Sequence, residues 1–164
     1  MRQQAAGFED LRGADVSATV PISERLLNEL IQESLPASVP VRDLHVAPQA
    51  GDRFAVRGRF GSSPLIPSLK VTVLIHRQPD LPSSPALVLK LEMGALTAFA
   101  GPALRFLDAL PPGMHVDGDR IHVDLAKLLE QRGLGQYLGF IRQLEVHTTD
   151  GAVAASIRAG VPRG

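Results

Sequence analysis

The sequence contains no cysteine and no tryptophan, and aromatic residues make up only 4% of its 164 residues. Without cysteine the chain has no disulfide and no thiol nucleophile, and this absence fits a reducing or an oxidising compartment equally well. So few aromatic rings leave little material for the stacking platforms that bind single-stranded nucleic acids. Because 17 Lys and Arg balance 17 Asp and Glu, no overall basic field attracts a phosphate backbone. We therefore expect no nucleic-acid partner.

Long apolar runs are also missing. The most apolar stretch, from Met93 to Leu104, is well short of the roughly 20 residues that a transmembrane helix needs. Residues 1–14 lack the apolar core of a signal peptide. As it stands, the chain is expected to be cytoplasmic; if a signal peptide was removed, a periplasmic or secreted location is expected instead. Its length predicts a single domain over residues 15–159, with flexible ends at 1–14 and 160–164.

What the sequence does contain is alternation of apolar and polar residues, which is typical of half-buried strands. It predicts strands over 15–20, 41–47, 53–60, 69–77 and 86–93, and hairpins at Asp117-Gly118 and around Asp150-Gly151, the latter joining strands 139–148 and 152–159. Arg53, Arg57 and Arg59 lie on the face opposite Phe54 and Val56. We interpret these arginines as a solvated face in preference to an anion-binding patch. Loops join the three strands from 53 to 93, which predicts an antiparallel meander.

Three helices are predicted among the strands. The first is capped by Ser23 and runs to Ser34, with an apolar stripe of Leu26, Leu27, Leu30 and Ile31, while Asn28 is placed on the solvent side. A largely apolar helix is expected from Pro102 to Leu110. A short helix, Leu125 to Arg132, is expected to be capped by Asp124 and to end at Gly133.

Several phrases in this order resemble bacterial relatives of the tubular lipid-binding superfamily. They are VSATVPISERLLNELI (16–31), PALVLKLEM (85–93), GDRIHVDLAKLLEQRG (118–133) and IRQLEVHTTDGAVAASIRAG (141–160). The resemblance implies an α+β fold in which a curved antiparallel meander wraps around one long amphipathic helix, with additional short helices, as in a half-barrel. It also implies an elongated apolar groove for acyl chains. The chain departs from secreted members in lacking an evident signal or a lipidation cysteine.

The function expected from this combination is non-enzymatic binding of a lipid or other elongated apolar ligand, with no cofactor. The side chains expected to line the groove are Leu26, Leu30, Phe54, Val56, Val73, Leu89, Phe99 and Phe106. An aliphatic sheet face is equally what a filled core requires. A protein-interaction or homo-oligomeric self-association module with such a core is therefore the first alternative.

The second alternative is a metal-dependent enzyme that uses the segment from His115 to Asp124. Histidine and carboxylate side chains are natural ligands for zinc-like ions, and this segment holds His115, Asp117, Asp119, His122 and Asp124. Hairpin-turn and helix-cap chemistry explain the same residues better. We expect no metal and assign no catalytic residue. His45, His76 and His147 fall at strand positions, where exposure or cross-strand pairing is expected.

Overall fold

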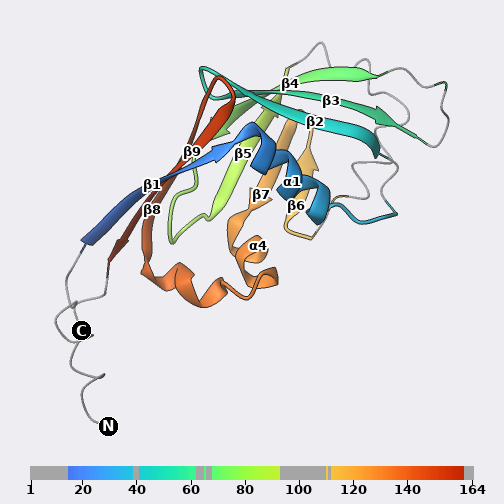
Figure 1. Cartoon of the computed structure of the whole chain (residues 1–164). Helices are drawn as coiled ribbons and strands as arrows, with labels where there is room; N and C mark the ends of the chain where they lie inside the picture. Colours follow the sequence, from blue (N-terminus) through green and yellow to red (C-terminus); the bar gives the residue numbers. More distant parts are fainter. Residues whose placement is uncertain are drawn as a thin grey trace, which may run out of the picture.

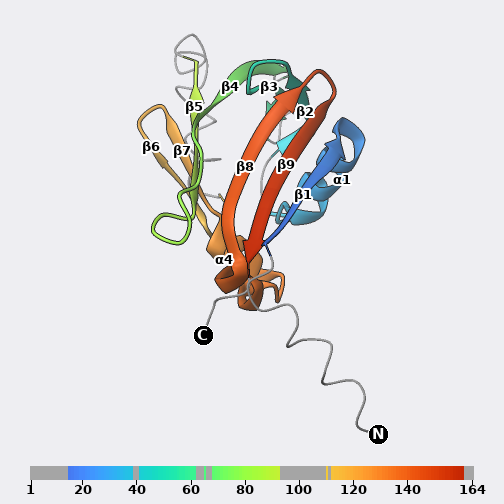
Figure 2. The ribbon, with the colours of Figure 1, turned by 90° about the vertical axis from the view of Figure 1, so that its left-hand side faces the viewer.

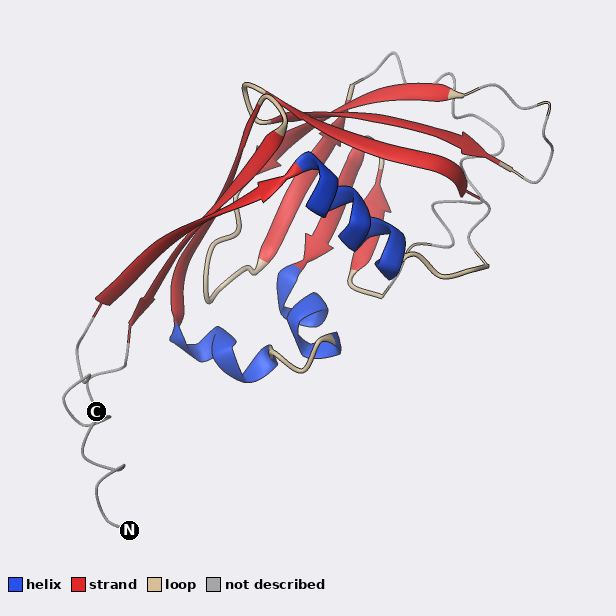
Figure 3. Ribbon diagram, in the orientation of Figure 1, coloured by secondary structure: helices blue, strands red, loops and turns tan. Residues whose placement is uncertain are grey.

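The computed structural model describes residues 15–38, 41–61, 65, 68–92, 110 and 112–160. These residues form two antiparallel sheets (Figure 1, Figure 3). Sheet A has the strand order β1 (Asp15–Ser23), β9 (Ala152–Gly160) and β8 (Ile141–Thr149). Sheet B has the order β2 (Val41–Gln49), β3 (Arg53–Phe60), β4 (Leu69–Arg77), β5 (Ala86–Leu91), β7 (Arg120–Asp124) and β6 (Met114–Asp117). The helices are α1 (Glu24–Ser34), α4 (Leu125–Gln131) and the 3₁₀ helix η2 (Gly135–Phe140).

Sheet B forms an arch. Figure 2 shows it rising from β2, beside α1, passing over β3 and β4, and descending on the other side through β5, β7 and β6, with α4 below. The predicted antiparallel meander is confirmed, because β2 to β5 pair in sequence order. The hairpin at Asp117-Gly118 and the closing hairpin β8–β9 are confirmed too. Gly160, predicted to lie in a flexible end, instead belongs to β9 and pairs with Asp15.

The predicted fold class is wrong in its central feature. The sequence predicts a meander wrapped around one long amphipathic helix, whereas the described residues are mostly strands in two sheets, with three short helices. α1 has 11 residues and lies beside the edge strand β2, without crossing the sheet (Figure 1). Of the predicted helix Pro102–Leu110, residues 102–109 lie outside the described residues, and Leu110 is not helical. The half-barrel around a long helix is therefore not what this chain forms.

The position of α1 follows from Asn28, which was predicted to face solvent. Its side chain is 7% exposed and pairs with the outer edge of β2: Nδ2 donates to the Val46 carbonyl at 2.8 Å and Oδ1 accepts from the Val46 N–H at 2.7 Å. Nδ2 also donates to the Glu24 carbonyl within α1. The Asn28 amide thus occupies the place of a neighbouring strand, and it fixes α1 against an otherwise unpaired sheet edge. Ser23 caps the helix as predicted, accepting from the Leu26 N–H.

A second amide joins the two sheets. Gln78 follows β4, and its side chain donates to the Val146 carbonyl and accepts from the Val146 N–H on the outer edge of β8, at 2.7 and 2.9 Å. Nearby, the turn between β2 and β3 meets the turn between β8 and β9. There Thr148, which is buried, donates to the Gln49 carbonyl and accepts from the Arg53 N–H at 2.9 Å. Asp52 accepts from the Thr148 N–H, and Asp150 accepts from the Ala50 N–H. We call this set of bonds the sheet junction.

Replacing Asn28 should destabilise the protein more than its single side chain suggests. In Asn28→Leu the N–H and carbonyl of Val46 lose their partners in a half-buried environment, so we expect the free energy of unfolding to fall by about 2 kcal/mol. Urea unfolding followed by circular dichroism measures this loss. The matched control is Gln32→Leu, an exposed position on the same helix, for which a change within about 0.5 kcal/mol is expected. Equal losses in the two variants would contradict the role of Asn28.

Candidate functional site

The broadest chemically uniform feature of the described residues is one face of sheet B. Strand register places its apolar side chains in rows that cross the sheet. Phe54, Val73 and Leu91 form one row, and Val46, Val56 and Val71 form the next. Further rows are Ile75, Leu89, Ile121 and Val116, and Leu87, Val123 and Met114. We call this surface the apolar face.

The centre of the apolar face is buried and its flanks are not. Val71 and Val73 are 4% and 6% exposed, and Leu87 and Val123 are also buried. Around them, Phe54, Val56, Leu89 and Ile121 keep intermediate exposure. Covering an aliphatic surface that reaches partly into solvent removes apolar area from water, which is energetically favourable.

The structure treats the eight predicted groove residues unequally. Register places Phe54, Val56, Val73 and Leu89 together on the apolar face. Leu26 is 43% exposed on α1, and Leu30 lies on the same helix beside β2 with intermediate exposure. Phe99 and Phe106 lie outside the described residues. Half of the predicted set is therefore brought together, and sequence alternation was the signal that found it.

Two hollows in the described surface are lined mainly by polar residue types and lie away from the apolar face. One, of about 180 Å³, is on the polar side of sheet A and is lined by Ser17, Thr19, Glu145, Ser156 and Arg158 among others. The second lies over α1 and β2, against Glu24, Asn28, Gln32 and His45. Neither hollow includes a residue of the apolar face.

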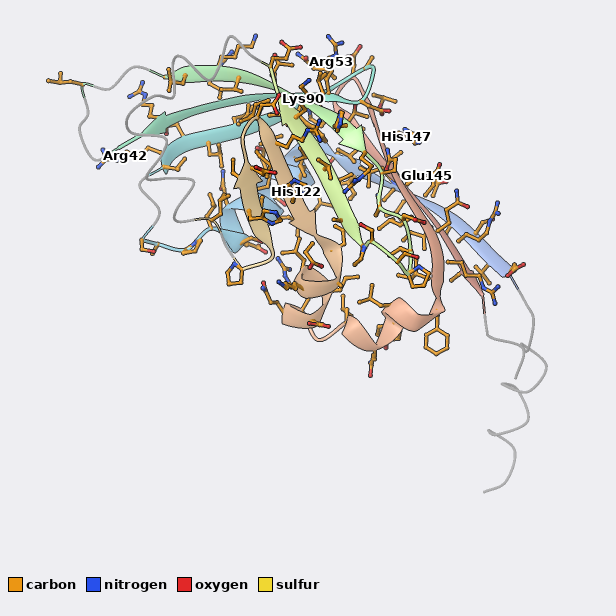
Figure 4. The ribbon with its side chains drawn as sticks, turned by 180° about the vertical axis from the view of Figure 1, so that it is seen from behind. Arg42, Arg53, Lys90, His122, Glu145 and His147 are labelled. Carbon is orange, nitrogen blue, oxygen red and sulfur yellow. The ribbon has the colours of Figure 1, made fainter. Side chains whose placement is uncertain are left out.

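The face of sheet B opposite the apolar face is basic over β2, β3 and β4. Arg57 lies directly between His45 and Lys70, and Arg42 lies opposite Arg59. Arg59 has a 3.8 Å contact with Asp43, whereas Arg57 and Lys70 have no carboxylate partner among the described residues. Figure 4 shows Arg42 at one end of this part of the sheet. The arginines are exposed, as a solvated face requires, but their like charges oppose one another across strands.

The residues from His115 to Asp124, considered above as metal ligands, have other partners. Asp124 caps α4, accepting from the Lys127 N–H at 3.1 Å, and Asp119 approaches Lys90 at 3.8 Å. The rings of His115 and His122 stack with centroids 4.5 Å apart. In the part of the chain that the structure describes, no three His, Asp or Glu side chains are grouped to hold a metal ion. The predicted turn and cap are both confirmed.

His147, at the sheet junction, is a histidine with two carboxylate neighbours. Its Nδ1 lies 3.1 Å from Asp52 Oδ2 and its Nε2 lies 3.5 Å from Glu145 Oε2; Figure 4 shows Glu145 and His147 near each other along β8. The hydrogen bond with Asp52 raises the pKa of His147, more than burial lowers it. Burial raises the pKa of Asp52, but bonds from the Thr148 N–H and from His147 outweigh it, so that the pKa is lowered. His45 is likewise paired, with Glu24 at 2.7 Å, and His76 is exposed.

Comparison with known proteins adds no neighbour. No family model, no curated protein and no solved structure matches the chain. The resemblance to the tubular lipid-binding superfamily accordingly stays a prediction. Among the described residues, no helix is long and apolar enough to cross a membrane.

The His147 contacts predict a pH dependence of stability. Because the pKa of His147 is raised in the folded protein, protonated His147 stabilises the folded state fully at pH values below its ordinary pKa of 6.5. This stabilisation is lost as the pH rises through the folded-state pKa. Because the pKa of Asp52 is lowered in the folded protein, ionised Asp52 stabilises the folded state fully at pH values above its ordinary pKa of 3.8. This stabilisation is lost on acidification. We expect the wild type to exceed His147→Asn in unfolding free energy between about pH 4 and 6.5, by less than about 1 kcal/mol because the ring is half exposed.

The difference between wild type and His147→Asn should shrink as pH is raised toward 9. Urea unfolding at intervals of pH measures it. His76→Asn is the control, since His76 is an exposed strand histidine with no ion pair among the described residues. A difference between wild type and His147→Asn that is constant with pH would contradict the coupling.

The crowding of charge around Arg57 predicts a stabilising substitution. Arg57→Glu would place a carboxylate opposite Lys70, turning repulsion into attraction, and such a cross-strand pair contributes roughly 0.2–1 kcal/mol. We expect the unfolding free energy to rise by up to about 1 kcal/mol at low salt and the gain to shrink in about 1 M salt. Arg57→Gln is the control that removes repulsion without adding attraction. A loss of stability in Arg57→Glu would show that the basic face is not under repulsive strain.

Proposed function

We propose that this protein binds an elongated apolar molecule, such as a fatty acyl chain, along the apolar face of sheet B, without catalysing a reaction on it. One observation supports the proposal: aliphatic rows of three or four strands each overlap, so that together they extend from β2 to β6, while their flanking side chains keep partial exposure. Covering the partly exposed flanks would remove further apolar area from water and so favours an apolar ligand. The proposal does not require a tube around a long helix.

The dimensions of the apolar face suit a chain-like ligand. Neighbouring strands are about 4.8 Å apart, so six strands extend over roughly 24 Å, the scale of a long extended acyl chain. Each methylene that leaves water contributes about 0.8 kcal/mol. Affinity should therefore rise with acyl length by about tenfold for every two methylenes, until the chain outgrows the sheet.

The first experiment is native mass spectrometry of the protein purified without detergent, together with organic extraction and titration of a fluorescent fatty acid. We expect an acyl species to copurify, or saturable binding that strengthens from C10 to C16. If no apolar species copurifies and the fluorescent fatty acid does not saturate, the proposal is wrong. If binding is saturable but independent of chain length, the apolar face is not the contact surface.

Two neighbouring residues of β5 provide a matched pair of variants for that titration. Leu89 belongs to the apolar face and Lys90 points to the opposite face. Leu89→Gln exchanges apolar contact for an amide, and we expect the affinity to fall about tenfold or more, because a buried leucine contributes at least about 1.5 kcal/mol. Lys90→Gln introduces the same side chain on the other face and should leave affinity unchanged. Circular dichroism verifies that both variants fold, and equal losses in both would contradict the assignment.

A further inference from the structure

The free edges of the two sheets are protected unequally. The edge of β2 is bound by Asn28 and that of β8 by Gln78 and the sheet junction, and β6 has only four residues. β1 differs, because its nine residues form a full-length edge and every residue from Asp15 to Pro21 is exposed. No described residue bonds to the outer edge of this segment. An unpaired edge of this length is a template for another strand.

The backbone groups that β1 offers can be deduced from its ladder with β9. The Glu24 N–H donates to the Gly151 carbonyl at 3.0 Å, in register with the β1–β9 pairs, so Ile22, Val20, Ala18 and Val16 are the residues that bond β9. Ser17 and Thr19 then direct both N–H and carbonyl outward. Pro21 falls on the outward side too, where its missing N–H breaks no bond to β9. The alternation in β8 agrees, because Val146 bonds Gln78 and leaves its partner Ala155 to bond Val20.

The sequence of β1 is complementary to itself. In an antiparallel pairing centred on Ala18, Ser17 lies opposite the partner's Thr19, and the two exchange both backbone hydrogen bonds, twice over by symmetry. Val16, which is 60% exposed, lies opposite the partner's Val20, which is 45% exposed. Asp15, the one charged residue of β1, lies opposite the partner's Pro21, so no like charges meet.

We propose that β1 pairs with β1 of a second copy of this chain, antiparallel and centred on Ala18. The two three-stranded sheets then become one sheet, and the apolar side of β1 continues across the two-fold axis. A second copy fits better than a foreign peptide because its β1 supplies Thr19 for the backbone bonds of Ser17 and Val20 for contact with Val16. The proposal is independent of ligand binding, since β1 belongs to sheet A and the apolar face to sheet B.

The absence of cysteine makes the register directly testable. Ala18 lies on the two-fold axis in a non-hydrogen-bonded pair, where α-carbons are about 4.5 Å apart and a disulfide can form. Ala18→Cys should therefore crosslink rapidly to a dimer under mild oxidation. Val20→Cys is the control, because its two thiols would lie about 13 Å apart, four residues along the strand. Equal rates of crosslinking in the two variants would overturn the proposed register.

The second test asks whether the outer edge of β1 carries the association. Thr19→Pro removes an N–H that points outward and leaves the ladder to β9 intact, whereas Thr19→Val keeps the N–H; both lose the Thr19 hydroxyl contact with Ser156. Sedimentation is compared from about 5 to about 500 µM, since so small an interface implies micromolar affinity. We expect dimer in the wild type and Thr19→Val, and at least tenfold weaker association in Thr19→Pro. A wild type that stays monomeric over this range, or equal association in both variants, overturns the proposal.

Discussion

Hydrogen bonds between the β2–β3 turn and the β8–β9 turn hold the two sheets together, beside the bonds of Gln78 with Val146. Thr148 stands at the centre of the turn bonds: its hydroxyl serves Gln49 and Arg53, and its N–H is held by Asp52. These groups lie in or next to tight turns, and backbone polar atoms that leave water there must find partners. Each turn supplies hydrogen-bond partners to the other, and α1, which follows β1 of sheet A and is bonded through Asn28 to β2 of sheet B, gives a further connection. The apolar face and β1 are held in their relative places by this junction.

Side-chain amides act in this protein as substitutes for strands. Asn28 and Gln78 each use both ends of the amide against one residue of an edge strand, Val46 and Val146, in the donor and acceptor pattern of a neighbouring backbone. The two amides come from different elements, one from a helix and one from the segment after a strand. Each closes an edge that would otherwise attract another chain. Among the described residues no such group bonds β1, and this contrast is what makes its open edge informative.

The sequence was sufficient for most of the elements and insufficient for their assembly. Period-two alternation located the strands, and Ser23 and Asp124 were recognised as helix caps because their chemistry is local. Asn28 was assigned to the wrong side of its helix, because counting apolar residues cannot reveal that an amide will be needed at a sheet edge. The pairing of β1 with β9 was not predicted either, since alternation within a strand says nothing about its partner. A long central helix was predicted from the resemblance to the tubular lipid-binding superfamily, and that prediction is wrong, because α1 has only 11 residues and lies beside β2.

The pairing of β1 with β9 also bears on how the chain comes off the ribosome. Asp15 lies opposite Gly160, so β1 is synthesised more than a hundred residues before β9, the strand that it pairs with. Until β9 has been synthesised, both edges of β1 are unpaired, and Val16 and Val20 have no neighbouring strand. The β2–β5 meander, by contrast, can form from local contacts. Chains that stall or end before β9 would therefore expose both edges of β1, which can pair with other strands. The strand whose outer edge is exposed in the folded protein, β1, is thus also the described strand whose pairing partner is synthesised latest after it.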